Sequence, residues 1–296
     1  MVVPRGPPGR FRAGCAVSEL PPDRSHVLTE AEHLSGRDLG SASIEESIEW
    51  FAEDHEQVVE SLRRAGPQLA PLIEDVVKAL RIGGRLIYVG AGTSGRLGVL
   101  DASECPPTFN IDPSSVIGLI AGGDTALRTS SEGLEDDALG AHEAMQRLSV
   151  GPDDVLVGIA AGGTTPYVLG AIEEAHRRGA MAAMITCAPR DPPLGCRHLI
   201  VLETGPELLA GSTRLKAGSV TKLALNTITT VAFSQLGKVR GGLMIDMRAT
   251  NDKLYDRAIR ILLRLFPELS REKAARSLQE SNSDLRATIE RLERSS

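Results

Sequence analysis

The sequence predicts an α/β fold in three layers, a parallel sheet with helices on both faces, followed by a small helical module. Short apolar segments alternate with helical patterns between Arg85 and Gln235, the order expected of βα units with right-handed crossovers. These segments are nearly continuous in apolar residues, as in strands that are buried on both sides. Glycine-rich turns follow several of them, and folds of this kind bind ligands beyond the carboxyl ends of the strands.

The elements follow from apolar spacing and from helix-breaking residues. Ser43–Leu62 is expected to be a helix that opens with a capping box of Ser43 and Glu46, and a second helix is expected from Pro67 to about Leu80. The predicted strands are 85–89, 116–120, 154–160, 181–186 and 199–202, and the predicted helices among them are 95–103, 131–148, 165–178 and 212–235.

The chain divides into three regions. Residues 1–42 are expected to be a disordered leader, because the first 25 are rich in Pro, Gly and Arg and lack the apolar core of a signal peptide. Residues 43–247 form the predicted sheet domain with its N-terminal helices. Residues 248–296 contain three helical patterns, broken at Pro267 and at Ser281–Ser283, and form the predicted C-terminal module.

Composition restricts the partners and the compartment. The 33 Lys and Arg against 39 Asp and Glu give a net charge of −6, which argues against nucleic acid as a partner, and the C-terminal module has no clear basic excess for a DNA-binding helix-turn-helix. No apolar run approaches the roughly 20 residues of a membrane span. The four cysteines form no C-x-x-C pair, which favours a reducing cytoplasm.

The segment Gly90–Arg96 carries the strongest chemical signal. An apolar strand ends in glycines, then Thr93 and Ser94, and a helix begins at once. Free N–H groups at a helix start bind anions, and hydroxyls add donors, so we expect Thr93, Ser94 and Gly95 to bind a phosphate. An ordinary βα turn is the alternative. No Lys follows as in a nucleotide P-loop, and no acidic residue ends the next strand as in a dinucleotide site.

Two later segments repeat this pattern. The turn Ala160–Pro166 places Thr164 and Thr165 before a predicted helix, where they could bind another part of the same ligand or simply cap the helix. The segment Gly205–Gly218 gathers further candidate ligand contacts, although a solvated, capped helix would look similar. Those candidates are Glu207, Ser212, Thr213 and Lys216.

Acid–base chemistry needs positioned carboxylates. Glu104 precedes Pro106-Pro107, so its helix is expected to end near Cys105, which would put the carboxylate at the negative end of the dipole and suit a proton donor. A surface glutamate at a helix end is the alternative. A second acidic cluster, Glu132 with Glu135 to Asp137, opens the next predicted helix, where acids usually only complement the dipole.

Taken together, these segments resemble the N-acetylmuramic acid 6-phosphate etherase family, over roughly residues 43–290. The matching strings are Gly90-Ala91-Gly92-Thr93-Ser94-Gly95-Arg96-Leu97-Gly98, Leu100-Asp101-Ala102-Ser103-Glu104-Cys105-Pro106-Pro107-Thr108, Gly118–Gly123, Glu132–Asp137, Pro206–Gly218, and Asp246 with Ala249–Leu254. The resemblance implies a sugar isomerase (SIS) fold and a homodimer that needs no metal or organic cofactor. It implies cleavage of the D-lactyl ether of a small sugar phosphate, in the recycling of cell-wall sugars, with Glu104 and Glu135 as the two catalytic carboxylates.

The chain departs from the family in its second glycine loop. The family usually has Ser-Gly-Arg-Thr-Pro, and this chain has Gly162-Gly163-Thr164-Thr165-Pro166, so a hydroxyl and a guanidinium are missing. Two other classes are kept as alternatives, a non-catalytic sugar-phosphate sensor related to glucokinase regulatory protein and an aldose–ketose isomerase. If the helix from Gly95 to Ser103 is straight, its length of roughly 12 Å takes Glu104 away from its own phosphate loop, which predicts a site near a dimer interface.

Overall fold

The computed structural model describes residues 27–131 and 133–295. Its centre is a five-stranded sheet in the order β2-β1-β3-β4-β5 with every neighbouring pair parallel. This confirms the predicted fold class. The strands are β1 (Leu86–Gly90), β2 (Val116–Ile120), β3 (Val155–Ile159), β4 (Met181–Thr186) and β5 (Cys196–Val201).

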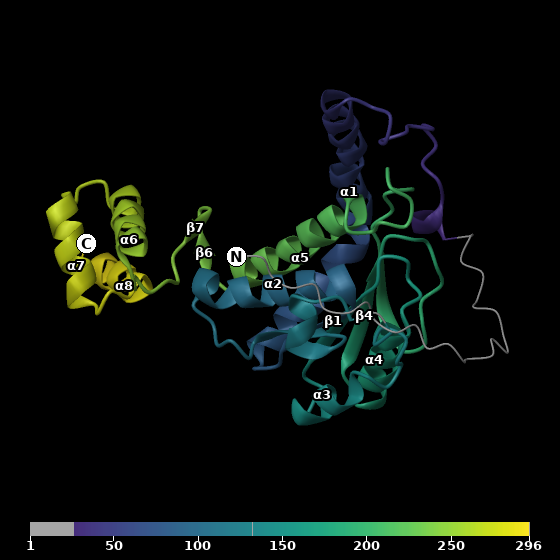
Figure 1. Cartoon of the computed structure of the whole chain (residues 1–296). Helices are drawn as coiled ribbons and strands as arrows, with labels where there is room; N and C mark the ends of the chain where they lie inside the picture. The colour runs from purple at the N-terminus through teal and green to yellow at the C-terminus, as the bar shows by residue number, and fades with distance from the viewer. Residues whose placement is uncertain (1–26, 132, 296) are drawn as a thin grey trace, which may run out of the picture.

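Helices cover both faces of the sheet, as Figure 1 shows. One core joins alternate strand residues such as Tyr88 and Val157 to apolar residues of three helices, α1, α2 and α5. The other joins the intervening residues, such as Ile87 and Leu156, to two helices, α3 and α4. The helices are α1 (Ile44–Arg81), α2 (Gly92–Phe109), α3 (His142–Arg147), α4 (Pro166–Arg177) and α5 (Lys216–Gln235).

The strand order creates a crevice between two loops. From β1 the chain passes to β2 on one side, and β3 then pairs with the other side of β1. The loops after β1 and β3 therefore leave the sheet in opposite directions, and ligands of open α/β sheets bind at such a switch point. These two loops are the first and second glycine-rich segments of the sequence.

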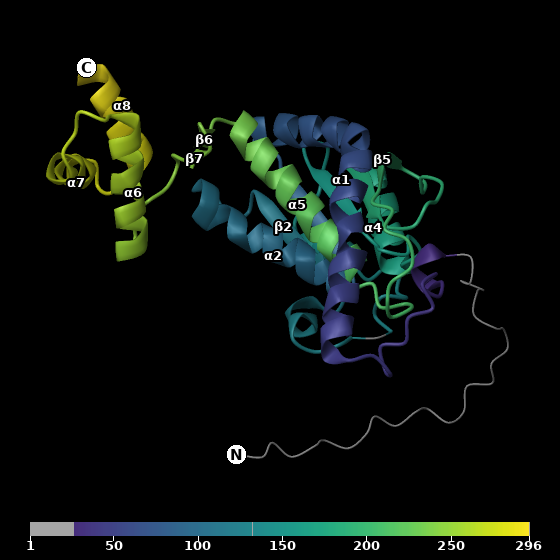
Figure 2. The ribbon, with the colours of Figure 1, turned by 90° about the horizontal axis from the view of Figure 1, so that it is seen from above.

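The N-terminal helix differs from the prediction of two helices. α1 is one element that includes Pro67 and Pro71, and its ribbon changes direction along its length (Figure 2). A proline inside a helix removes one backbone hydrogen bond and kinks the helix without ending it when packing holds both halves. The capping box of Ser43 and Glu46 is present as predicted.

The helix that carries Glu104 is longer than predicted. α2 begins at Gly92 and continues through Pro106 and Pro107 to Phe109, where Asn110 in the left-handed conformation ends it. The expectation that the helix ends near Cys105 is wrong, because proline keeps a helical φ and the last turn is held by the bond from the Asn110 N–H to the Pro106 carbonyl. Glu104 therefore lies inside the helix and not at the helix exit where it was predicted to act as a proton donor.

The predicted helix 131–148 is also mostly wrong. Only α3 is helical, and the described residues from 131 to 141 form turns and bends. Gly133 adopts a positive φ of 94°, and the carboxylate of Asp137 accepts from the Leu139 N–H in a local turn. Both features compete with helix formation.

The predicted disordered leader of residues 1–42 includes residues that pack against the sheet domain. Residues 1–26 lie outside the described residues, whereas Val27 and Thr29 are buried. The Thr29 carbonyl accepts a hydrogen bond from the Gly211 N–H at 3.1 Å. The segment around Val27 and Thr29 therefore packs against the sheet domain, contrary to the prediction.

The C-terminal helices lie apart from the sheet (Figures 1 and 2). A short antiparallel pair, β6 (Val239–Arg240) and β7 (Leu243–Met244), leads to α6 (Asp252–Leu265), α7 (Arg271–Glu280) and α8 (Leu285–Ser295). These helices share an apolar core with Ile245 and Met247. In the described part of the chain, no helix combines the length and the apolar character that crossing a membrane would require.

Candidate functional site

The first glycine loop is a tight connection from β1 to α2. Gly92 has a φ of 53°, which suits glycine, and Gly90 and Gly95 touch so closely that a Cβ on Gly95 would lie 2.6 Å from the Gly90 carbonyl oxygen. The Gly95 N–H also donates to the Ala91 carbonyl. The N–H of Gly95, a residue predicted to contact phosphate, is therefore already used in a backbone bond, and the close contact with Gly90 gives Gly95 a packing role.

Six hydroxyl groups remain free around the glycine loops. Each of these side chains is half-buried, and none makes a hydrogen bond to another described residue. They are Thr93, Ser94, Thr164, Thr165, Ser212 and Thr213. Side chains at the starts of α2 and α4 make no capping bond either. The first N–H groups of α2 are open to a ligand, whereas α4 begins with Pro166, and its Tyr167 and Val168 N–H groups donate to backbone carbonyls.

The third segment does not present all of its predicted contacts to a ligand. Glu207 is fully buried, and its carboxylate accepts from the N–H groups of Lys216 at 3.0 Å and Ala217 at 2.9 Å. Burial raises the pKa of Glu207, although these bonds oppose the shift. The Lys216 ammonium is also enclosed, donating to the Pro206 carbonyl at 2.8 Å. Glu207 and Lys216 therefore hold the loop and the start of α5.

A buried ion pair that was not predicted from the sequence completes this arrangement. The Lys216 Nζ lies 2.6 Å from Oδ1 of Asp54 on α1, and His33 Nε2 lies 3.1 Å from the same oxygen. Asp54 falls at helical spacing between Phe51 and Val58, so a charged residue on a core-facing position was the available signal. The network ties the segment around His33 to α1 and α5.

Contacts bring the three polar segments together. A Cβ on Gly218 of α5 would lie 3.6 Å from the Thr93 methyl group and 3.4 Å from the Thr213 carbonyl oxygen, which places the first loop against the third segment. A Cβ on Gly162 would lie 3.6 Å from the Thr29 hydroxyl, and Thr29 also bonds to the third segment through Gly211. These contacts place the three segments next to one another at the carboxyl edge of the sheet.

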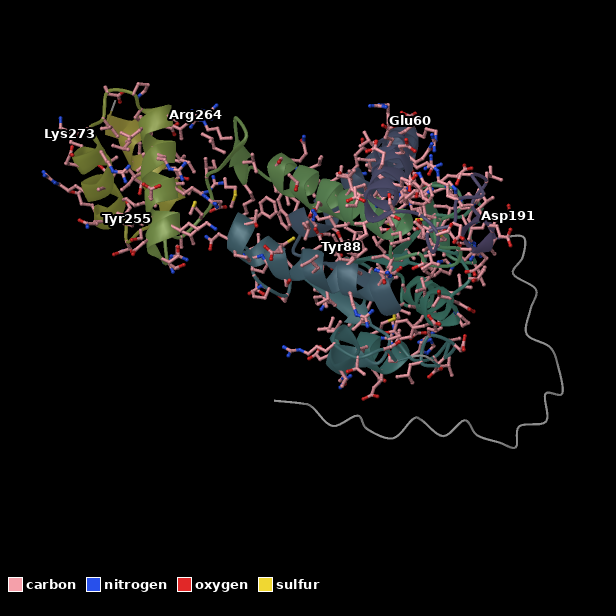
Figure 3. All side chains as sticks on the ribbon, turned by 45° about the horizontal axis from the view of Figure 1, so that its top comes forward. Glu60, Tyr88, Asp191, Tyr255, Arg264 and Lys273 are labelled. Carbon is pink, nitrogen blue, oxygen red and sulfur yellow. The ribbon has the colours of Figure 1, made fainter. Side chains whose placement is uncertain are left out.

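A buried polar network holds α2 against β1 and α5. The Tyr88 hydroxyl on β1, labelled in Figure 3, donates to Asp101 Oδ2 at 3.0 Å. Asn226 and Thr229 on α5 donate to the other carboxylate oxygen at 2.7 and 3.2 Å. Burial raises the pKa of both Tyr88 and Asp101. This network sets the rotation of α2 and therefore the direction of Glu104.

The two predicted catalytic carboxylates are exposed and unpaired. Glu104 lies on α2 one turn after Asp101, and Glu135 lies in the turn before α3, where its carbonyl accepts from the Tyr167 N–H at 3.0 Å. Neither carboxylate has a hydrogen-bond partner among the described residues. The structure does not bring Glu104 into contact with Glu135 or with the hydroxyls of the first loop.

Comparison with solved structures supports the fold. A Bacteroides fragilis protein assigned as a phosphosugar isomerase involved in capsule formation superposes with a TM-score of 0.50 at 18% identity, over 68% of this chain and 95% of that chain. A family model for the glucokinase regulatory protein N-terminal SIS domain matches residues 68–176. That range includes β1, β2, β3 and the first two glycine loops.

Sequence relatives are far more similar. The N-acetylmuramic acid 6-phosphate etherase of Crocosphaera subtropica is 50% identical over 268 residues, which are 90% of this chain and 88% of the relative. That of a Picosynechococcus species is 51% identical over 259 residues, 87% of this chain and 86% of the relative. Identity of this extent, on an SIS-type sheet with free hydroxyls at its switch point, shows that the chain belongs to the N-acetylmuramic acid 6-phosphate etherase family.

Proposed function

We propose that this chain cleaves the D-lactyl ether of N-acetylmuramic acid 6-phosphate, giving N-acetylglucosamine 6-phosphate and D-lactate. The observation that carries the proposal is the set of six free, half-buried hydroxyls around the open start of α2 and the neighbouring loops at the carboxyl edge of the sheet. Hydroxyls and N–H groups suit a phosphate and a polyhydroxylated ring. Relatives named for this activity match about nine-tenths of the chain, which selects the substrate.

The chemistry needs one base and one acid. In the open-chain sugar the C2 proton is acidic because C2 neighbours the C1 aldehyde. A carboxylate removes that proton, the C3–O bond breaks as a carboxylic acid protonates the leaving lactate oxygen, and a C2–C3 double bond forms. Water then adds its oxygen to C3, and C2 regains a proton. Each transfer contributes about 10²–10⁴-fold, and we assign the two roles to Glu104 and Glu135.

Other residues bind or position the substrate. Thr93 and Ser94 at the start of α2 hold the phosphate in this proposal, and Thr164, Thr165, Ser212 and Thr213 contact the sugar or the phosphate. Glu207 and Lys216 act as positioning residues, because their charged groups already bond to the protein. They keep the third segment beside the first loop.

We further propose a homodimer whose sites share residues of both subunits. Glu104 lies nine residues after Gly95 in one unbroken helix, on the order of 13 Å along the axis, which exceeds the reach from a bound phosphate to C3 of the same sugar. Leu100, one turn earlier, is 46% exposed, and Ile44 and Ile48 on α1 are 75% and 64% exposed. A second copy would cover such apolar residues.

The cytoplasm is the compartment that fits this proposal. Cys105, Cys187 and Cys196 are free thiols in the described chain, as is usual under reducing conditions. Burial raises the pKa of Cys105 and Cys187 to about 12, which keeps both as unreactive thiols.

One assay tests the activity against its alternatives. The chain is incubated with N-acetylmuramic acid 6-phosphate, and D-lactate is measured. The etherase releases lactate, whereas an aldose–ketose isomerase or a sugar-phosphate sensor releases none. Tight binding of the sugar phosphate without lactate would contradict the proposal and favour the sensor.

Mixed subunits test the shared site. Glu104→Gln and Glu135→Gln chains are each expected to lose activity while still binding N-acetylglucosamine 6-phosphate. If a site takes one glutamate from each subunit, a mixed dimer contains one site with both wild-type glutamates and recovers activity. Single variants that stay active would refute the catalytic roles, and mixtures that recover nothing would refute sharing.

A further inference from the structure

A cavity at the end of β3 and β4 lies outside the phosphate loop. It has a volume of about 460 Å³, and Leu169 on α4 lines it together with three other segments of the chain. They are Val27 and Leu28, the second glycine loop with Gly162, Gly163 and Thr164, and the segment after β4 with Ala188, Pro189, Arg190 and Asp191. Figure 3 shows Asp191 at the edge of the sheet domain, beside the first described residues.

Arg190 is held in this cavity by backbone carbonyls. Its Nε donates to the Asp191 carbonyl at 2.9 Å, and its Nη1 donates to the Gly163 carbonyl across the gap between the two loops. Arg190 makes no ion pair with any carboxylate among the described residues, and its Nη2 has no partner there. The side chain is half-buried, so a fixed guanidinium keeps a free donor beside the cavity.

The second glycine loop is shaped around this side chain. Gly163 has a φ of 75°, and a Cβ on it would lie 2.9 Å from Arg190 Cδ and 3.0 Å from the Thr186 hydroxyl. The neighbouring Thr164 hydroxyl is half-buried and makes no hydrogen bond to another described residue. Thr29, fully buried, has a hydroxyl without a partner, and this oxygen lies 3.6 Å from the position of a Cβ on Gly162.

We propose that Arg190 binds an anionic group of the substrate and replaces the guanidinium that the second glycine loop lacks. The loop has Thr164 where the family usually has Arg, and the Arg190 guanidinium reaches the same loop from the adjacent strand. An arginine fixed by carbonyls and free of carboxylates is suited to a carboxylate or a phosphate oxygen. Asp191 lines the same cavity, but its side chain is exposed at the rim.

The proposal rests on the proposed function for the identity of the anion. The substrate carries two anions, the 6-phosphate and the lactyl carboxylate. β4 is two strands from β1 in the sheet, about 9–10 Å at the usual strand spacing, so one sugar can extend from the first loop to Arg190. With the phosphate held by Thr93 and Ser94, the lactyl carboxylate is the anion expected at Arg190, and separate ligands show whether the phosphate binds there instead.

The test measures the affinity of three ligands for two chains, one with Arg190 and one with Arg190→Gln. Both chains also carry Glu135→Gln, which stops turnover. N-acetylmuramic acid 6-phosphate carries both anions, N-acetylglucosamine 6-phosphate only the phosphate, and N-acetylmuramic acid only the carboxylate. Loss of a charge-assisted bond should weaken binding roughly tenfold to a hundredfold. We expect that loss for the doubly charged ligand and for one of the other two, with the third unchanged. Arg197→Gln, on an exposed side chain of β5, is the matched control.

Two outcomes would overturn the proposal. Unchanged affinity for all three ligands would show that Arg190 contacts no anion, and equal weakening for all three would show that it only shapes the loop. If Arg190→Gln does not fold, phenylglyoxal modification of the wild-type chain gives the answer, because a bound anion must protect Arg190. Absence of protection by both singly charged ligands at saturation would refute it. Failure of the etherase reaction is seen separately, as missing D-lactate from the wild-type enzyme.

Discussion

At the scale of single residues, the charges that support the site are buried in pairs. Lys216 and Asp54 have side chains only 2% and 4% exposed, and their charged atoms are 2.6 Å apart. Removing one charge from such a pair leaves the other without compensation in a low-dielectric interior, which costs much more than the pair itself contributes. Substituting one residue of the pair therefore tests whether this contact holds the third segment in place.

The first prediction concerns this pair. Lys216→Met should lower the free energy of unfolding by about 3–5 kcal/mol, because it leaves the Asp54 carboxylate buried with only His33 as partner. Urea denaturation measures the loss. The double variant Asp54→Leu/Lys216→Met removes both charges and should lie closer to wild type. A Lys216→Met chain as stable as wild type would show that the pair does not hold the loop.

The second prediction concerns pH. Hydrogen bonds from Arg177, and then from Arg178, lower the pKa of Glu174 on α4 to about 2. The folded pKa lies below the unfolded value of about 4.3, so this contribution to stability is complete above that value and is lost as the pH falls toward 2. In the Glu174→Gln variant, stability should therefore fall less steeply as the pH decreases. Melting temperatures measured from pH 6 to pH 2 test this, and parallel curves for variant and wild type would contradict it.

At the scale of elements, α2 connects the phosphate loop to Glu104. Its start depends on Gly90 and Gly95 in contact, its rotation on the Asp101 network, and its end on Asn110. Asn110 has a φ of 50°, a left-handed conformation that costs most residues about 1–2 kcal/mol and that glycine adopts freely. The proline pair before it therefore does not end the helix.

The third prediction follows from that cap. Asn110→Gly should leave the free energy of unfolding unchanged or raise it, whereas Asn110→Val should lower it by about 1–2 kcal/mol, because a β-branched side chain does not tolerate this conformation. Chemical denaturation of the two variants gives the comparison. Equal stabilities would mean that α2 does not end in a left-handed residue at position 110.

At the scale of the whole molecule, two bodies with separate cores are joined by a thin connection. The sheet domain has one core on each face, and the C-terminal helices have a third. The labelled residues Tyr255, Arg264 and Lys273 lie on that second body, away from Tyr88 (Figure 3). We propose that residues 248–296, with Ile245 and Met247 packed into the same core, form a module that is tethered to the sheet domain.

The fourth prediction tests this division. Leu262 is fully buried in the third core, and Leu262→Ala should destabilise the module by about 2–5 kcal/mol through the cavity it leaves. Hydrogen exchange should then rise in α6, α7 and α8 but not in β1 or β3. Val157→Ala in the sheet core should show the reverse pattern. An equal rise in both bodies after Leu262→Ala would mean that they unfold together.

The sequence predicted much of the sheet and failed where long-range contacts decide. The predicted bounds of β2 and β4 agree with the structure, because apolar runs between turn residues identify buried strands. The ends of α2 and the turns from residue 133 to 141 were not predicted correctly. Proline and acidic residues occur both inside helices and at their ends, so they do not decide where a helix stops. The cap at Asn110 decides the end of α2, and packing against Tyr167 decides the turns before α3.

The sequence by itself determined the fold class, the order of the strands along the chain and the residue types of the three polar segments, since these depend on periodicity and composition. Only the tertiary structure decided which charges are free. Glu207 and Lys216 look like ligand contacts in sequence but are enclosed by the protein, whereas Arg190 carries no sequence signal and faces a cavity. The reason is that burial and pairing of a charged group depend on residues distant in the chain, such as Asp54 for Lys216 and Gly163 for Arg190.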